Sequence, residues 1–132
     1  GDIALIVLDK SFPDAFLASY LTIPYFVKGD RQKWIILGAG ATSEGGNFAS
    51  TLQGDEIATE SNSDCVSDYN AANMGKYFRQ DTHFCAGIEN YAAGACSEGD
   101  LGAPLLKSIN GFIYVAGLAS FGDSGCGKHD AP

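Results

Sequence analysis

The sequence predicts an all-β protein, and three observations carry that prediction. Apolar runs are short, and Gly, Pro, Asp, Asn or Ser bounds each of them, as at the ends of strands. Val, Ile, Tyr and Phe fill the runs, and such side chains suit a pleated, half-buried surface. The 132 residues include 17 glycines and 45% hydrophobic residues, a composition typical of one compact domain. Many short strands with turn signals between them favour a barrel or a sandwich.

Five segments are expected to be strands. In chain order they are 3–8 (IALIVL), 33–40 (KWIILGAG), 48–59 (FASTLQGDEIAT), 103–109 (APLLKSI) and 112–120 (FIYVAGLAS). The last two are joined by the Asn-Gly of residues 109–112, which indicates a tight hairpin because Asn and Gly tolerate a positive φ.

One segment has helical character. Residues 65–78 (CVSDYNAANMGKYF) predict a short helix, with Ser67 or Asp68 as N-cap and Gly75 as its stop. Residues 18–32 show little periodicity and are predicted to be a connection.

The formal net charge of −8 argues against binding to nucleic acid or to an anionic membrane, since both require clustered Lys and Arg. No apolar run approaches the roughly 18 residues that suggest a membrane span. We therefore expect neither a nucleic-acid partner nor a membrane partner.

Four cysteines are compatible with two disulfides in three possible connectivities. No pair has the close spacing of a zinc site, and neither His83 nor His129 completes one, so no metal and no cofactor are expected. Disulfides persist in oxidising compartments, which predicts a secreted, extracellular protein.

Five stretches match motifs that occur together in one family, in that family's order. Residues 1–8 (GDIALIVL) are similar to an Asp-Ile-Ala-Leu strand, residues 33–40 to Cys-x-x-x-Gly-Trp-Gly, and residues 84–87 (FCAG) to Phe/Met-Cys-Ala-Gly. Residues 96–104 (CSEGDLGAP) resemble Cys-x-Gly-Asp-Ser-Gly-Gly-Pro, and residues 117–127 (GLASFGDSGCG) resemble Gly-Ile-x-Ser-Trp-Gly-x-x-Gly-Cys. Together these stretches resemble the chymotrypsin-like serine proteases, in which the first carries the catalytic aspartate and the last lines the specificity pocket.

The resemblance implies a double β-barrel, of which this chain holds mainly the second, a six-stranded antiparallel barrel, plus one strand of the first. Residues 1–17 are then the end of the first barrel and 18–32 the connection between barrels. Residues 33–132 form the second barrel, without its C-terminal helix. The motif that carries the catalytic histidine has no counterpart in this sequence.

The resemblance also decides between two candidate nucleophile turns. Residues 99–104 (GDLGAP) keep the Gly, Asp, Gly and Pro of the nucleophile turn, with Leu101 at the serine position. Ser124 follows Gly-Asp as a nucleophile would, but its segment matches the pocket wall. A leucine side chain has no atom that a base can activate to attack a carbonyl carbon.

Further roles follow from the same matches. Asp2 matches the catalytic aspartate, although a buried polar anchor bonded to nearby backbone is an equally good interpretation. The backbone N–H groups of Gly99 and Leu101 match the oxyanion hole, where an extra residue places Glu98 nearby. Asp100 matches the aspartate that pairs with the freed N-terminus in active members; here it is expected to need another cation or a separate chain.

The predicted specificity pocket is neutral, because Gly94 stands where trypsin-like members have an aspartate. Its wall is formed by Ser120, Phe121 and Gly122. The resemblance pairs Cys65 with Cys85 and Cys96 with Cys126. A third family disulfide is missing, since Trp34 occupies the position of one of its cysteines.

These matches predict a catalytically inactive serine protease homologue that acts by binding proteins, such as a protease, a protease substrate or a cascade component. The alternative is one part of an active two-chain serine endopeptidase, with the catalytic histidine on another segment. A stored fragment without a dedicated partner is a third possibility. In each case, the apolar strand 3–8 predicts non-covalent packing against an N-terminal segment of the same precursor.

Overall fold

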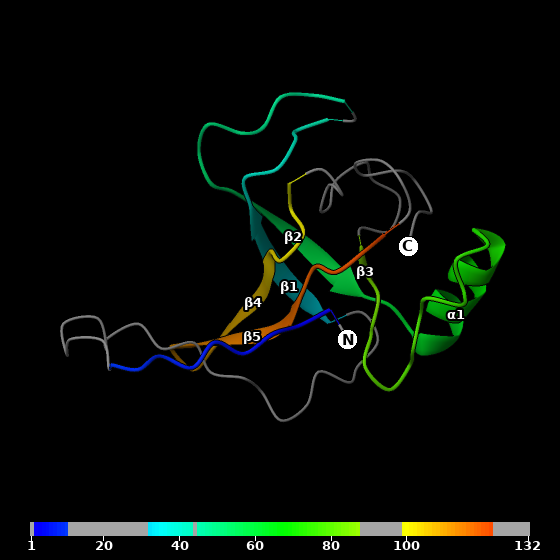
Figure 1. Cartoon of the computed structure of the whole chain (residues 1–132). Helices are drawn as coiled ribbons and strands as arrows, with labels where there is room; N and C mark the ends of the chain where they lie inside the picture. The colour runs from blue at the N-terminus through cyan, green and yellow to red at the C-terminus, as the bar shows by residue number, and fades with distance from the viewer. Residues whose placement is uncertain (1, 11–31, 44, 88–98, 123–132) are drawn as a thin grey trace.

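The computed structural model describes residues 2–10, 32–43, 45–87 and 99–122 (Figure 1). Its elements, in chain order, are the strands β1 (Lys33–Gly38) and β2 (Gln53–Thr59), the helix α1 (Asn62–Ala71), and the strands β3 (Ala86–Gly87), β4 (Pro104–Ile109) and β5 (Phe112–Leu118).

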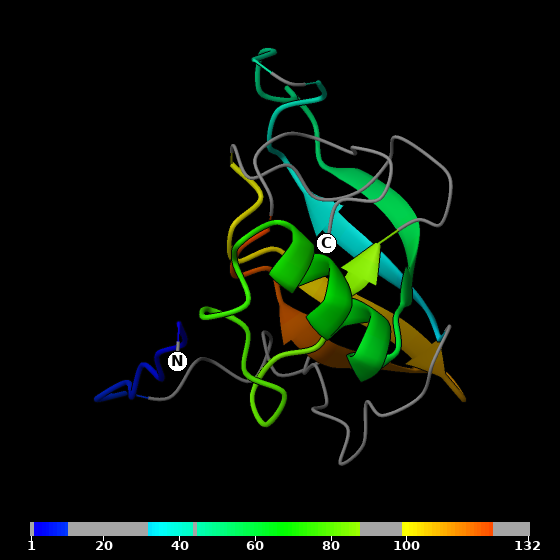
Figure 2. The same ribbon diagram turned by 90° about the vertical axis from the view of Figure 1, so that its right-hand side faces the viewer.

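The strands form one antiparallel sheet in the order β3-β2-β1-β4-β5. The all-β prediction is therefore confirmed, with five strands in the described ranges where six were predicted for the barrel. The boundaries of the two barrels and of their connection stay a prediction. Helix α1 lies beside the β3 side of the sheet, and the quarter-turn view of Figure 2 shows it in front of that side.

The core lies on one face of the sheet, because side chains alternate between faces along each strand. In β1, Trp34 and Ile36 are buried while Lys33 and Ile35 are exposed. The buried residues of this cluster are Trp34, Ile36, Ile57, Ala103 and Leu105.

Trp34, which stands where the resemblance expects a family cysteine, takes part in contacts between β1 and β4. Ile35 and Ile36 pair with Leu106 and Leu105, and the Nζ of Lys107 lies 5.1 Å from the centroid of the Trp34 ring. A cation over an aromatic face is stabilising, so β1 and β4 are clamped at this point by a non-covalent contact.

Three predicted strands are confirmed in position, and the hairpin is confirmed in detail. β1, β4 and β5 fall inside the predicted segments. Asn110 and Gly111 have φ of 52° and 83°, and Ile109 pairs with Phe112. The strand expected from residue 48 begins only at Gln53; before it, Phe48 makes an isolated bridge to Ala41.

The predicted helix was misplaced by one turn. α1 starts three residues earlier than expected, and its N-cap is Ser61 rather than Ser67 or Asp68. The Ser61 hydroxyl accepts a hydrogen bond from the Asp64 N–H at 3.1 Å, which satisfies an N–H that has no partner within the helix. The helix ends at Ala71, before Asn73 takes a φ of 59°, so Gly75 is not its stop.

The prediction of a strand at residues 3–8 is wrong. No strand pairs with this segment among the described residues, and Leu5 and Val7 are each 92% exposed. A strand needs a hydrogen-bonded neighbour, and the described part of the chain provides none at this place.

Candidate functional site

The turn around Leu101 is fixed to the end of β5 by backbone hydrogen bonds. The Gly102 N–H donates to the Ala119 carbonyl at 2.7 Å, and the Ala119 N–H donates to the Ala103 carbonyl at 2.9 Å. Gly99 and Gly102 have φ of 97° and 88°, a region that favours glycine. The turn therefore keeps a defined shape with Leu101 at its tip, 58% exposed.

Asp100 lies against a glycine cradle at the end of β1. The Gly40 N–H donates to the Asp100 Oδ1 at 2.8 Å. A Cβ on Gly38 or Gly40 would overlap that carboxylate. The glycines of residues 38 and 40 are thus required by the close approach of Asp100, a reason that the sequence pattern alone did not reveal. A cation or N-terminal amine bound to Asp100 stays a prediction.

Asp2, near the start of the sequence, is hydrogen-bonded to a residue close to the Leu101 turn. The Ser120 hydroxyl donates to the Asp2 Oδ2 at 2.9 Å. Ser120 follows Ala119, whose backbone holds the Leu101 turn. Asp2 is exposed and bonded to a side-chain hydroxyl, so the buried anchor bonded to backbone is not what the structure has. This hydrogen bond joins two residues that are 118 positions apart in the sequence.

Phe121, the central residue of the predicted pocket wall, is anchored on α1 by Tyr69. The two rings meet edge to face at 5.4 Å, and the Tyr69 hydroxyl donates to the Phe121 carbonyl at 3.4 Å. Tyr69 is 4% exposed and stacks on Phe78 at 5.4 Å. Ser120, Phe121 and Gly122 are half-buried, so this wall is held in place and still borders solvent.

Sequence reasoning missed Tyr69, Phe78 and His83 as supports of this wall. Cys65 and Tyr69 are four residues apart on the helix, and they are its two buried side chains. That spacing places both on one helix face, and it was the available signal. His83 was considered as a zinc ligand, yet its ring lies edge-on to Phe121 at 5.3 Å.

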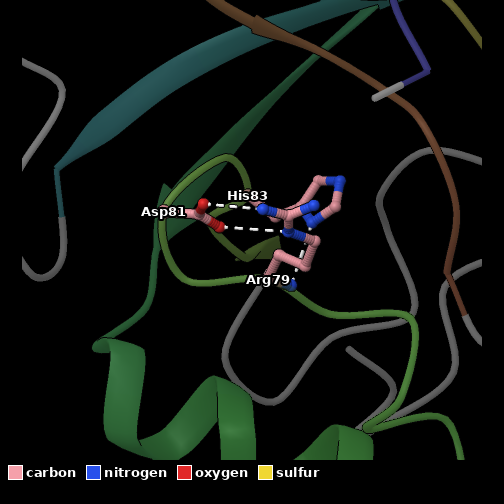
Figure 3. Close-up of polar contacts among 3 residues, drawn as sticks. All are labelled: Arg79, Asp81 and His83. Carbon is pink, nitrogen blue, oxygen red and sulfur yellow. Dashed lines mark hydrogen bonds and ion pairs between the residues drawn. The ribbon is translucent and has the colours of Figure 1, made fainter.

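His83 belongs to a small polar turn (Figure 3). Its Nδ1 accepts a hydrogen bond from the Arg79 backbone N–H at 3.0 Å, and the Arg79 guanidinium binds Asp81 at 2.9 Å. The hydrogen bond from Arg79 lowers the pKa of the Asp81 carboxyl, and Asp81 raises the pKa of Arg79. His83 is thus engaged with Arg79 and with the aromatic rings of Phe78 and Phe121.

The disulfide between Cys65 and Cys85 is confirmed, with a Cα–Cα distance of 5.8 Å. It ties α1 to the segment before β3. Several predicted positions lie outside the described residues; they are Gly94, Cys96, Glu98, Ser124, Cys126 and His129. In the described ranges, no three His, Cys, Asp or Glu residues are grouped to hold a metal, and no helix is long and apolar enough to cross a membrane.

Comparison with known proteins agrees with this geometry. The family model described as Trypsin matches residues 1–132. Trypsin-1 of Astacus astacus is 37% identical over 132 residues, which are 100% of this chain and 53% of that protein. Serine proteinase stubble of Drosophila melanogaster is 36% identical over 98 residues, which are 74% of this chain and 12% of that protein.

A solved structure is also similar. Neuropsin, a serine protease expressed in the limbic system of mouse brain, matches with a TM-score of 0.69 and 30% sequence identity. The match covers 86% of this chain and 46% of neuropsin, so the chain spans about half the length of neuropsin and of trypsin-1. This chain belongs to the trypsin family, and its fold is that of a chymotrypsin-like serine protease.

Proposed function

We propose that this chain is a non-catalytic member of the trypsin family that acts by binding another protein in an extracellular setting. The observation that carries the proposal is Leu101 at the tip of an intact nucleophile turn. The turn keeps both positive-φ glycines and its bonds to Ala119, so the scaffold is retained while the reacting atom is replaced. A hydrocarbon at this place supplies neither nucleophile nor proton.

The side chains around Leu101 support a role in protein binding rather than loss of catalysis alone. Leu101 is 58% exposed, and Phe48, which is 67% exposed, lies against Gly99 at the start of the same turn. Exposed apolar side chains on a rigid turn are suited to protein contact, because little ordering is needed when a partner binds. The disulfide between Cys65 and Cys85 supports the extracellular setting.

A photo-crosslinking leucine analogue at position 101 tests the binding part of the proposal. In the full-length protein exposed to its native extracellular fluid, we expect one discrete crosslinked mass from position 101. The matched control is the same analogue at Leu52, which is 68% exposed and lies in the loop before β2. No product from position 101, or equal products from both positions, would contradict the proposal.

The alternative, one part of an active endopeptidase, draws support from one feature. Asp2, which matches the triad aspartate of the family, accepts a hydrogen bond from Ser120, the neighbour of Ala119 that holds the Leu101 turn. The missing hydroxyl at residue 101 outweighs this, because an aspartate only orients a histidine and does no chemistry alone.

We further propose that a segment of the precursor preceding Gly1 covers residues 3–8 without a covalent bond. Five apolar side chains there are exposed, and Leu5, Ile6 and Val7 are 87–92% exposed. A contiguous apolar stretch in water is unfavourable and marks an interaction site. This chain covers 53% of trypsin-1, so about half of that relative's length lies outside the match.

Hydrogen exchange on the full-length protein tests this packing. We expect the amides of residues 3–8 to exchange at least about tenfold more slowly in the full-length protein than in this chain alone, since a segment packed over them excludes water. Residues 45–47, in the loop before β2, are the internal control and should be unchanged. Equal exchange of residues 3–8 in both proteins would refute the proposed partner.

A further inference from the structure

The turn from Arg79 to His83 is closed by two hydrogen bonds between the same two residues. The His83 N–H donates to the Arg79 carbonyl at 2.7 Å, and the Arg79 N–H donates to the His83 Nδ1 at 3.0 Å. The second bond requires an unprotonated Nδ1, because only the neutral ring has a nitrogen that accepts. The closed turn is therefore tied to one protonation state of His83.

The His83 ring also contacts the aromatic side chains beside the predicted pocket wall. It lies edge-on to Phe121 at 5.3 Å and tilted to Phe78 at 6.0 Å. Phe121 is also held by Tyr69 and follows Ser120, which carries the bond to Asp2. A movement of His83 thus acts on the segment that joins the wall to the Leu101 turn.

The charged and titratable groups around His83 come from three elements. Arg79 and Asp81 lie in its own turn, where the guanidinium occupies both carboxylate oxygens of Asp81 at 3.3 and 2.9 Å. Tyr69 on α1 directs its hydroxyl to the Phe121 carbonyl, and Asp2 lies beyond Ser120. Arg79 lowers the pKa of Asp81, so both members of this ion pair stay charged in mildly acidic solution.

We propose that His83 is a pH-dependent latch on the aromatic wall formed by Tyr69, Phe78 and Phe121. While the imidazole is neutral, Nδ1 accepts the Arg79 N–H and the ring edge supports Phe121. Protonation places a second donor opposite the Arg79 N–H and a positive charge beside the guanidinium, so the bond is lost and the wall loosens. Imidazole titrates between about pH 5 and 8, the range in which extracellular and endosomal compartments differ.

The direction of the pH effect follows from the protonation state of His83 that the closed turn requires. The closed turn requires neutral His83, because a protonated Nδ1 is a donor and cannot accept the Arg79 N–H. Asp81 attracts an imidazolium, but its oxygens are already bound by Arg79 (Figure 3). The latch acts on the wall whether or not a partner binds, so it stands apart from the proposed function.

Nuclear magnetic resonance titration of the native protein from pH 8 to pH 5 tests the latch. We expect the ring signals of His83, the amide of Arg79 and the ring of Phe121 to follow one transition with a shared midpoint. The protection of the Arg79 amide against hydrogen exchange should fall about tenfold on acidification, the change expected for one lost hydrogen bond.

The matched variant is His83→Gln, whose side-chain oxygen accepts the Arg79 N–H without titrating. In that variant the transition at Arg79 and Phe121 should vanish, while the titration of His129 is unchanged. Phe121 signals that stay constant while His83 titrates in the native protein would overturn the proposal, even if the variant failed to fold. Persistence of the transition in a folded His83→Gln protein would overturn it as well.

Discussion

Replacing both Cys65 and Cys85 with alanine is expected to lower the free energy of unfolding by about 3 kcal/mol. The two cysteines are 20 residues apart in sequence, and closing a loop of that length restricts the unfolded chain by about this amount. Cys65 is fully buried and Cys85 is 6% exposed, so the alanines also leave a small cavity under Tyr69.

Urea denaturation of the double variant beside the native protein measures the loss, and the near-ultraviolet circular dichroism of Tyr69 and its neighbours reports the wall. The control is Ser67→Ala, an exposed position on the same helix, which should change the stability by less than about 0.5 kcal/mol. A double variant within about 1 kcal/mol of the native protein would show that α1 does not depend on the disulfide.

The variant Gly40→Ala is expected to lose about 2 kcal/mol, although it adds a single methyl group. The added Cβ would lie 2.6 Å from the Asp100 Cγ, and the carboxylate has to move away. That movement strains the turn and breaks the hydrogen bond from the Gly40 N–H, whose acceptor is charged.

The same substitution in β3 is the matched control. A Cβ on Gly87 meets only the Glu60 Oε1 at 3.5 Å, an ordinary contact, so Gly87→Ala should stay within about 0.5 kcal/mol of the native protein. Thermal or urea unfolding of both variants makes the comparison. Equal stabilities for the two alanine variants would mean that Asp100 is not seated on Gly40.

The sheet was predictable because its signals are local. The Asn-Gly of the hairpin and the alternation of buried and exposed residues along β1 need only a few neighbouring positions. The helix start was misjudged because Ser61, Ser67 and Asp68 are all acceptable N-caps. Packing of Cys65 and Tyr69 selected Ser61, and that packing depends on the distant Cys85 and Phe121.

The candidate site was predictable where it matches the family and not elsewhere. Leu101, Asp2 and Ser120 were singled out through the order of the matching stretches; the structure pairs Asp2 with Ser120 and bonds Gly102, next to Leu101, to Ala119, next to Ser120. The support of the wall by Tyr69 and His83 was missed, because ring contacts across 38 or more residues leave no pattern in the sequence. The predicted strand at residues 3–8 is absent for a related reason, since a continuous apolar run does not supply a partner strand.

The central claim is that the nucleophile position of this trypsin-family chain holds no nucleophile. The intact mass of the full-length protein after treatment with a serine-directed fluorophosphonate, with active trypsin treated in parallel, tests it most directly. We predict no adduct on this chain, including at Ser124, while trypsin is fully labelled. A covalent adduct on the folded chain that is absent after heat denaturation would contradict the claim.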